Sequence, residues 1–168
     1  MRFAIVPALL AASVLGAPVL GACSFTPLYA PQASGAPAIG PVLVDEVPGR
    51  SGFAMKNALD KLFDAERGTG PARRLAVKLD EGISGLGFRL DESATRSDLT
   101  LAATYTLYDV DGTEVTEGRA SAVASYDIPN SAYAEVAAQN DARDRAADML
   151  AERIRAELAI KLSAKRKS

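Results

Sequence analysis

Histidine is absent from this chain of 168 residues, and cysteine occurs only once, at Cys23. Without histidine the chain has no imidazole general base, no Ser-His-Asp or Cys-His nucleophile and no His/Cys cluster for a metal. The sequence therefore predicts no catalytic residues, no metal site and no cofactor, and so a protein that is not an enzyme. A pair of carboxylates among the 21 acidic residues is the one catalytic arrangement that stays open.

An excess of positive charge is also missing. The chain carries 19 basic and 21 acidic residues, which gives a formal charge of -2 at pH 7. This balance provides no basic field that could grip a phosphate backbone, so nucleic acid is not an expected partner.

Only one long hydrophobic run is present, from Phe3 to Leu20, and Pro18 interrupts it. The run follows the short basic start Met1-Arg2 and ends at the small residues Gly21-Ala22. This arrangement is typical of a signal peptide, here residues 1–22, that is cleaved on export. A permanent span would need about 20 apolar residues and a basic flank, and the chain continues instead into a proline-rich stretch.

The cysteine directly follows that segment, in the order Leu20-Gly21-Ala22-Cys23. A cysteine after leucine and two small residues resembles the lipobox of bacterial lipoproteins, which implies acylation of Cys23. Three acyl chains would make attachment to a membrane effectively permanent, since each buried methylene contributes about 0.8 kcal/mol. An ordinary secretory signal that ends near a free thiol is the alternative, although an unpaired cysteine is a liability in an oxidising compartment.

Prolines and glycines such as Pro27, Pro31 and Pro37 follow the cysteine. They resist both helix and continuous sheet, so residues 23–41 are expected to form a lipidated flexible tether. What remains of the chain suffices for one domain with its own core but scarcely for two. We therefore expect a single domain over residues 42–168.

The first half of this domain alternates strand and helix signals. A strand is expected over Val42 to Val47, followed by a helix with Ser51 as its N-cap and an apolar face from Met55 to Phe63. Alternating apolar residues then predict a strand over Leu75 to Leu79. The glycine-rich run Glu81 to Gly87 is expected to be an irregular loop.

The second half predicts a hairpin and a long helix. Leu99 to Leu107 alternate with polar residues before the turn Asp111-Gly112, and the return strand runs from Val115 to Ile128. A helix is expected from Ser131 to Ala164, because no glycine or proline interrupts this stretch. Its apolar stripe consists of Val136, Ala147, Leu150, Ala151, Ile154, Leu158 and Leu162. The basic residues expected on its wet faces are Arg143, Arg145 and Arg155, with a solvated terminus at Lys161, Lys165, Arg166 and Lys167.

Four strands and two amphipathic helices predict an α+β fold, a two-layer sandwich with both helices on one face of the sheet. The other face would then carry small polar side chains and one arginine. Its expected members are Thr100, Thr104, Thr106, Arg119, Ser121 and Ser125. A polar face with little charge suits water, the commoner case, and also suits burial against another polar surface.

Several short motifs in the expected order resemble the LptE family of LPS-assembly lipoproteins. They are Cys23-Ser24-Phe25-Thr26-Pro27-Leu28-Tyr29, Ala94-Thr95-Arg96, Ser125-Tyr126 with Ile128, Ser131-x-Tyr133-Ala134 and Asp141-Ala142-Arg143-x-Arg145-Ala146-Ala147. The family usually has glycine at the position of Ser24, so the opening motif departs from the pattern there. The residue after Cys23 is also not the aspartate that resembles an inner-membrane retention signal, which implies sorting to the outer membrane.

The resemblance implies a non-enzymatic partner of the β-barrel LptD. Such a protein would be anchored on the periplasmic side of the outer membrane, would sit in the barrel as a plug and would support transport of LPS. Direct binding of LPS phosphates would call for arginines, and Arg89, Arg96 and Arg119 are the candidates, although an exposed arginine on a strand is commonly a solubilising residue. The polar sheet face would then meet the barrel. The alternative is a lipid-anchored periplasmic adaptor for another envelope complex, docked through the same face or by strand addition.

Overall fold

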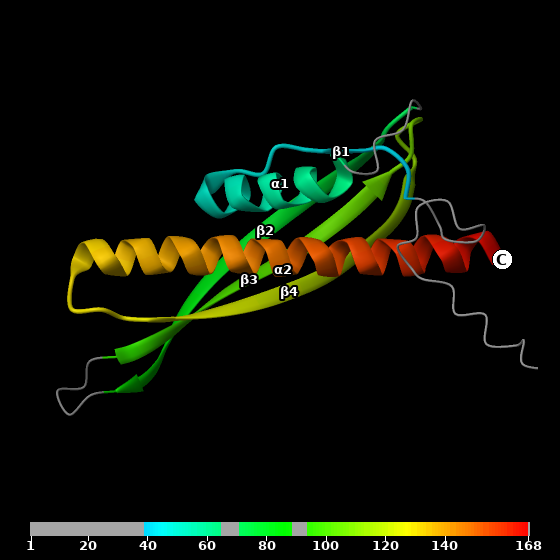
Figure 1. Cartoon of the computed structure of the whole chain (residues 1–168). Coiled ribbons are helices and arrows are strands. Elements are labelled where there is room, and N and C mark those ends of the chain that lie inside the picture. The colour runs from blue at the N-terminus through cyan, green and yellow to red at the C-terminus, as the bar shows by residue number, and fades with distance from the viewer. Residues whose placement is uncertain (1–38, 65–70, 89–93, 168) are drawn as a thin grey trace, which may run out of the picture.

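The computed structural model describes residues 39–64, 71–88 and 94–167. Its elements in chain order are β1 (Val42–Val44), α1 (Gly49–Asp64), β2 (Arg73–Phe88), β3 (Ala94–Tyr108), β4 (Glu114–Asp127) and α2 (Ala132–Lys167) (Figure 1). Cys23 and Arg89, together with the expected signal peptide and most of the tether, lie outside the described residues. Among those described, no helix is both long and apolar enough to cross a membrane.

The four strands form one open sheet in the order β1-β2-β3-β4. The short strand β1 runs parallel to β2, and the three long strands form an antiparallel meander. Both helices lie on the same side of this sheet, with α2 running along the strands (Figure 1). The predicted α+β sandwich with helices on one face is confirmed.

The core lies between the sheet and the helices. Every second residue of β3 from Leu99 to Leu107 is buried, as period-two alternation predicts. The helices contribute large apolar side chains to this core, and these are almost completely buried: Met55, Leu59 and Phe63 of α1 and Leu150, Ile154 and Leu158 of α2. Burial of one such side chain contributes about 1.5–3 kcal/mol, so these layers supply most of the driving force for folding. Val136, predicted to share the stripe of α2, is instead 49% exposed.

The run Glu81 to Gly87 is not an irregular loop, and that prediction was wrong. It continues β2, with Glu81 opposite Leu101 and Ser84 opposite Asp98 in β3. Glycine is a poor strand former locally, but ladder hydrogen bonds to a neighbouring strand outweigh this preference. The consequence is a pair of strands whose far ends cross behind α2 and continue beyond it (Figure 1).

Three boundaries near the start of the domain also differ from expectation. β1 ends at Val44 rather than Val47, and α1 begins at Gly49, where φ is +87°. Ser51 therefore lies within the first turn of α1 and does not cap it, and its hydroxyl donates to the Glu81 carboxylate instead. Ile39, which falls in the range expected for the tether, is buried in the core.

A partly buried ion pair joins the two layers. Arg143 of α2, predicted to lie on a wet face, is only 7% exposed. Its Nε and Nη2 atoms donate to the two oxygens of Glu81 at 2.9 and 2.8 Å, and its Nη1 atom donates to Asn140 at 2.8 Å. This hydrogen bonding lowers the pKa of Glu81, because the guanidinium stabilises the ionised carboxylate. The pair thus fixes α2 against β2.

A candidate interaction face on the sheet

One face of the sheet carries no helix, and we call it the helix-free face. It is formed by the side chains of β2, β3 and β4 that point away from α1 and α2, in cross-strand rows set by the register. These rows are Ala76/Thr106/Glu117, Lys78/Thr104/Arg119, Asp80/Ala102/Ser121, Gly82/Thr100/Val123 and Ser84/Asp98/Ser125. All the residues that the sequence predicted for this face lie on it.

The helix-free face is polar and open to solvent. Thr104, Arg119 and Ser121 are exposed, while Thr100 and Thr106 are half-buried between their neighbours. Hydroxyl groups are the most frequent side-chain groups in these rows, charged side chains are nearly as frequent, and Val123 is the one large apolar residue among them. The face therefore offers hydrogen-bonding and charged groups with little apolar surface.

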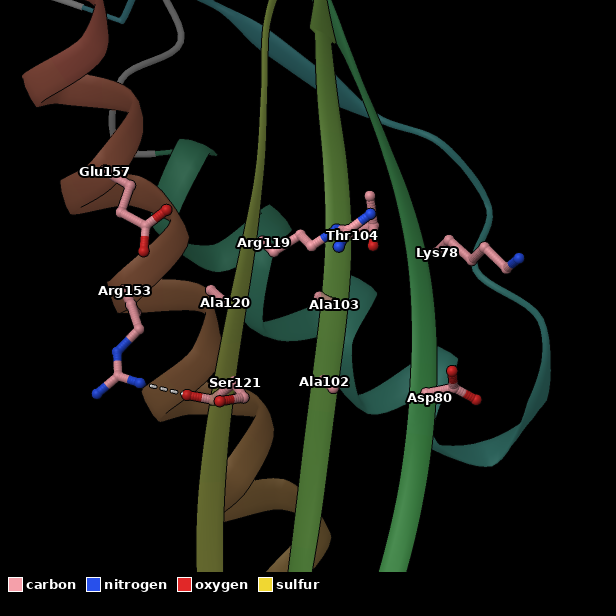
Figure 2. Close-up of a pocket in the computed structure, with 10 residues that line it drawn as sticks. All are labelled: Lys78, Asp80, Ala102, Ala103, Thr104, Arg119, Ala120, Ser121, Arg153 and Glu157. Atoms are coloured by element: carbon pink, nitrogen blue, oxygen red, sulfur yellow. Dashed lines mark hydrogen bonds between the residues drawn. The ribbon is translucent and has the colours of Figure 1, made fainter.

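The centre of this face opens into a shallow pocket of about 570 Å³ that reaches around β4 to α2 (Figure 2). Lys78, Arg119 and Arg153 contribute positive charge to it, and Asp80 and Glu157 contribute carboxylates. Figure 2 shows Arg153 turned to the edge of β4, where its guanidinium donates to the backbone oxygen of Ser121. The pocket is thus a mixed but cation-rich surface at the border between sheet and helix.

Two of these cations have no carboxylate partner among the residues that the structure describes. Lys78 and Arg119 flank Thr104 in one cross-strand row, and no ion pair joins either of them to an acid in that part of the chain. Exposed cations held at a fixed spacing on a rigid sheet suit an anionic group such as a phosphate.

Arg96 does not join them. It lies eight residues before Thr104 on β3, about 26 Å away along the strand. Its Nε atom is 3.7 Å from a carboxylate oxygen of Asp127, and both side chains are largely exposed. The structure thus separates the candidate arginines that it describes, with Arg119 in the pocket and Arg96 near the far end of the sheet.

On the side of the pocket formed by α2, a tyrosine contacts the lining residue Glu157. The hydroxyl of Tyr105 donates to Glu157 at 2.6 Å, and the amino group of Lys161 lies 5.3 Å from the centre of the Tyr105 ring. Burial, together with the Glu157 carboxylate, raises the pKa of Tyr105 above its ordinary value, so its hydroxyl remains a donor well above neutral pH. Gly118 leaves room for this ring, since a Cβ atom there would overlap the tyrosine hydroxyl.

The sequence did not single out the contribution of α2 to this region. Lys161 was predicted to belong to a solvated terminus and Arg153 was not singled out, yet each donates to a backbone oxygen of β4. The only signal available was their spacing of eight residues, which places them on one side of a helix.

Comparison with known proteins identifies the fold and its family. The family model described as LptE, Lipopolysaccharide-assembly, matches residues 39–158. The chain belongs to the LptE family. This assigns the LptE-family domain a role in LPS assembly, within a family of lipoproteins that act without catalysis.

Two solved structures are similar in fold to this chain. A lipoprotein from Caulobacter crescentus is 29% identical, with a TM-score of 0.63 over 77% of this chain and 94% of its own. A minor lipoprotein from Acinetobacter baumannii is 20% identical, with a TM-score of 0.55 over 75% of this chain and 92% of its own, and shows the same fold. No curated protein sequence matches the LptE-family chain significantly.

Proposed function

We propose that this LptE-family protein is an outer-membrane lipoprotein that occupies the lumen of an LptD-like β-barrel and supports transport of LPS to the outer leaflet. The helix-free face is the observation that carries the proposal. The lumen of a large barrel is polar, and a threonine-rich and serine-rich face can pack against it through direct and water-mediated hydrogen bonds. An equally large apolar face would not suit such a lumen.

The length of the sheet supports this role. β2 contains 16 residues, which corresponds to about 50 Å at the rise of an extended strand. A bilayer with its headgroups is about 40–45 Å thick. A domain aligned with the barrel axis would therefore reach from one side of the membrane to the other.

The anchor completes the arrangement. We propose that residues 1–22 are removed, that Cys23 is acylated, and that the chain after Cys23 connects the acyl chains to the single domain, whose core includes Ile39. The chains would hold the domain at the periplasmic rim of the barrel. The protein would act by binding alone, without a catalytic step.

Direct contact with LPS is proposed at the pocket. Lys78 and Arg119 would meet a phosphate of the lipid, because they are exposed, close in register and unpaired with acids among the described residues. Arg96 and Arg89 remain predictions as further contacts. Immobilised LPS should retain a K78Q/R119Q variant several-fold less well than wild type, whereas K61Q on the exposed surface of α1 should bind normally.

The decisive experiment is purification of the tagged full chain from outer membranes in mild detergent, with a photo-crosslinker at Thr104 or Ser121. A control carries the crosslinker at Asp148, an exposed position on α2. A stoichiometric β-barrel that crosslinks from the helix-free face and protects the domain from protease supports the plug. Recovery with a soluble or inner-membrane complex, or release and digestion of the domain, would favour the periplasmic adaptor and overturn the proposal.

A further inference from the structure

Basic side chains of α2 cover the outer edge of β4. β4 is the last strand of the sheet, so one row of its backbone groups faces away from β3. Four carbonyl oxygens in this row accept hydrogen bonds from cations of α2. The pairs are Arg145 with Ser125 at 3.1 Å, Arg153 with Ser121, Lys161 with Glu117, and Lys165 with Val115 at 3.3 Å.

The spacing of these bonds is regular. The first three donors follow one another at intervals of eight residues on α2, and their acceptors follow at intervals of four residues in the opposite direction along β4. Eight helical residues advance about 12 Å, and four strand residues advance about 13 Å. Helix and strand therefore run antiparallel with matched repeats, and the cations meet successive edge carbonyls. We call this set of four bonds the edge ladder; Figure 2 shows its contact between Arg153 and Ser121.

An uncovered edge strand is a template for pairing with another strand. β4 is 14 residues long, and its edge-facing groups would otherwise offer acceptors along most of that length. A β-barrel consists of such strands, and before it closes it has two open edges of its own. A domain that enters a barrel thus risks joining the barrel's sheet.

We propose that the edge ladder closes β4 against addition of an extended strand, whether from the open edge of a barrel or from a second copy of this chain. Protection against a strand of the barrel rests on the function proposed above. Protection against a second copy of this chain does not, because it concerns the isolated protein. With β4 closed, the domain contacts its partner through side chains of the helix-free face and keeps this edge of its sheet separate. The ladder does not cover the opposite edge, where β1 pairs with β2 only over Arg73 to Leu75.

The test compares the full chain in detergent with the variant R145Q/R153Q/K161Q/K165Q. Light scattering should show a concentration-dependent dimer for this variant and a monomer for wild type. Hydrogen exchange of the Glu117 and Ser121 amides, which face the same edge, should slow at least tenfold in the dimer. Two controls should stay monomeric: R145K/R153K/K161R/K165R, which keeps the donors, and R50Q/K61Q/R74Q/R96Q, which removes as many charges elsewhere.

The result that overturns the proposal is a folded glutamine variant that stays monomeric with fast β4 amides, or one that associates while other strands become protected. If the fourfold variant does not fold, the double variant R153Q/K161Q is compared with wild type in the same two measurements. A further experiment measures hydrogen exchange of the β4 amides in the complex with the barrel. If exchange is slow in the variant complex but not in the wild-type complex, the strand that has paired with β4 belongs to the barrel. Failure of wild type to recover any barrel would count against the proposed function and leave the self-association result standing.

Discussion

Neutralising Arg143 tests whether its ion pair with Glu81 holds α2 against β2. In the variant R143Q the guanidinium is lost, and the Glu81 carboxylate keeps only the hydroxyl of Ser51 as a described hydrogen-bond partner. Asn140 also loses the donor at 2.8 Å and keeps a weaker contact with Arg50 at 3.3 Å. The substitution therefore leaves a partly buried negative charge between β2 and α2 without its counter-ion.

The expected cost follows from burial. Removing one partner of a fully buried ion pair costs about 3–5 kcal/mol, and a hydrogen bond to a charged group contributes about 1.5–3 kcal/mol. The Glu81 side chain keeps 23% of its exposure, so water recovers part of the loss. We expect the free energy of unfolding to fall by about 2 kcal/mol and the melting temperature by about 7 °C for a domain of this size.

Urea unfolding of wild type, R143Q, E81Q and the double variant measures this cost and the coupling energy between the two side chains. The exposed pair of Arg96 and Asp127 supplies the control, because R96Q should change the free energy of unfolding by less than about 0.5 kcal/mol. A coupling energy below about 0.5 kcal/mol between Glu81 and Arg143 would refute the argument that this ion pair fixes α2 to the sheet.

Three further predictions concern the same layers. Since Arg143 lowers the pKa of Glu81, the stability from this pair should be complete above the pKa of the carboxyl in the unfolded chain and should fade as pH drops through its pKa in the folded protein. The urea midpoint should therefore fall more between pH 6 and pH 3 for wild type than for R143Q. An equal fall in both proteins would contradict this linkage. Replacing Gly118 by alanine places a methyl group against the Tyr105 hydroxyl and should lower thermal stability by about 1–3 kcal/mol, so an unchanged melting temperature would show that the ring moves freely. The variant Y105F leaves Glu157 without its donor and should destabilise the fold by about 1–2 kcal/mol, measured by urea unfolding, with E157Q as the comparison that keeps an acceptor.

The sequence predicted the fold where local pattern and tertiary role agree. The alternation in β3 and β4 identified both strands within a few residues, because one face of each strand is buried and the other faces solvent. It failed for the end of β2, since the pairing of Glu81 to Gly87 with β3 is a long-range effect that the glycines do not reveal. Arg143 was misplaced for a similar reason, because a helical pattern does not show which carboxylate lies opposite a charged residue inside a buried stripe.

The candidate site was predictable in part. Period-two alternation placed the threonines, the serines and Arg119 on one face before any pairing was known. The proximity of Lys78 to Arg119 depends on the register of three strands, which sequence pattern alone does not determine. Lipidation of Cys23 stays a prediction, since that residue lies outside the described part of the chain.

The position of α2 in the chain has a consequence for synthesis and folding. This helix of 36 residues follows every strand, and its side chains cover the inner face of β3 and β4. Until α2 has emerged, a meander that has already paired would expose Leu99, Leu101 and Leu107 to water. Nascent chains that expose such a surface are prone to aggregate and are substrates for chaperones. Completion of the core therefore waits for the final helix, and a chain that stops before Leu150 would keep this apolar surface exposed.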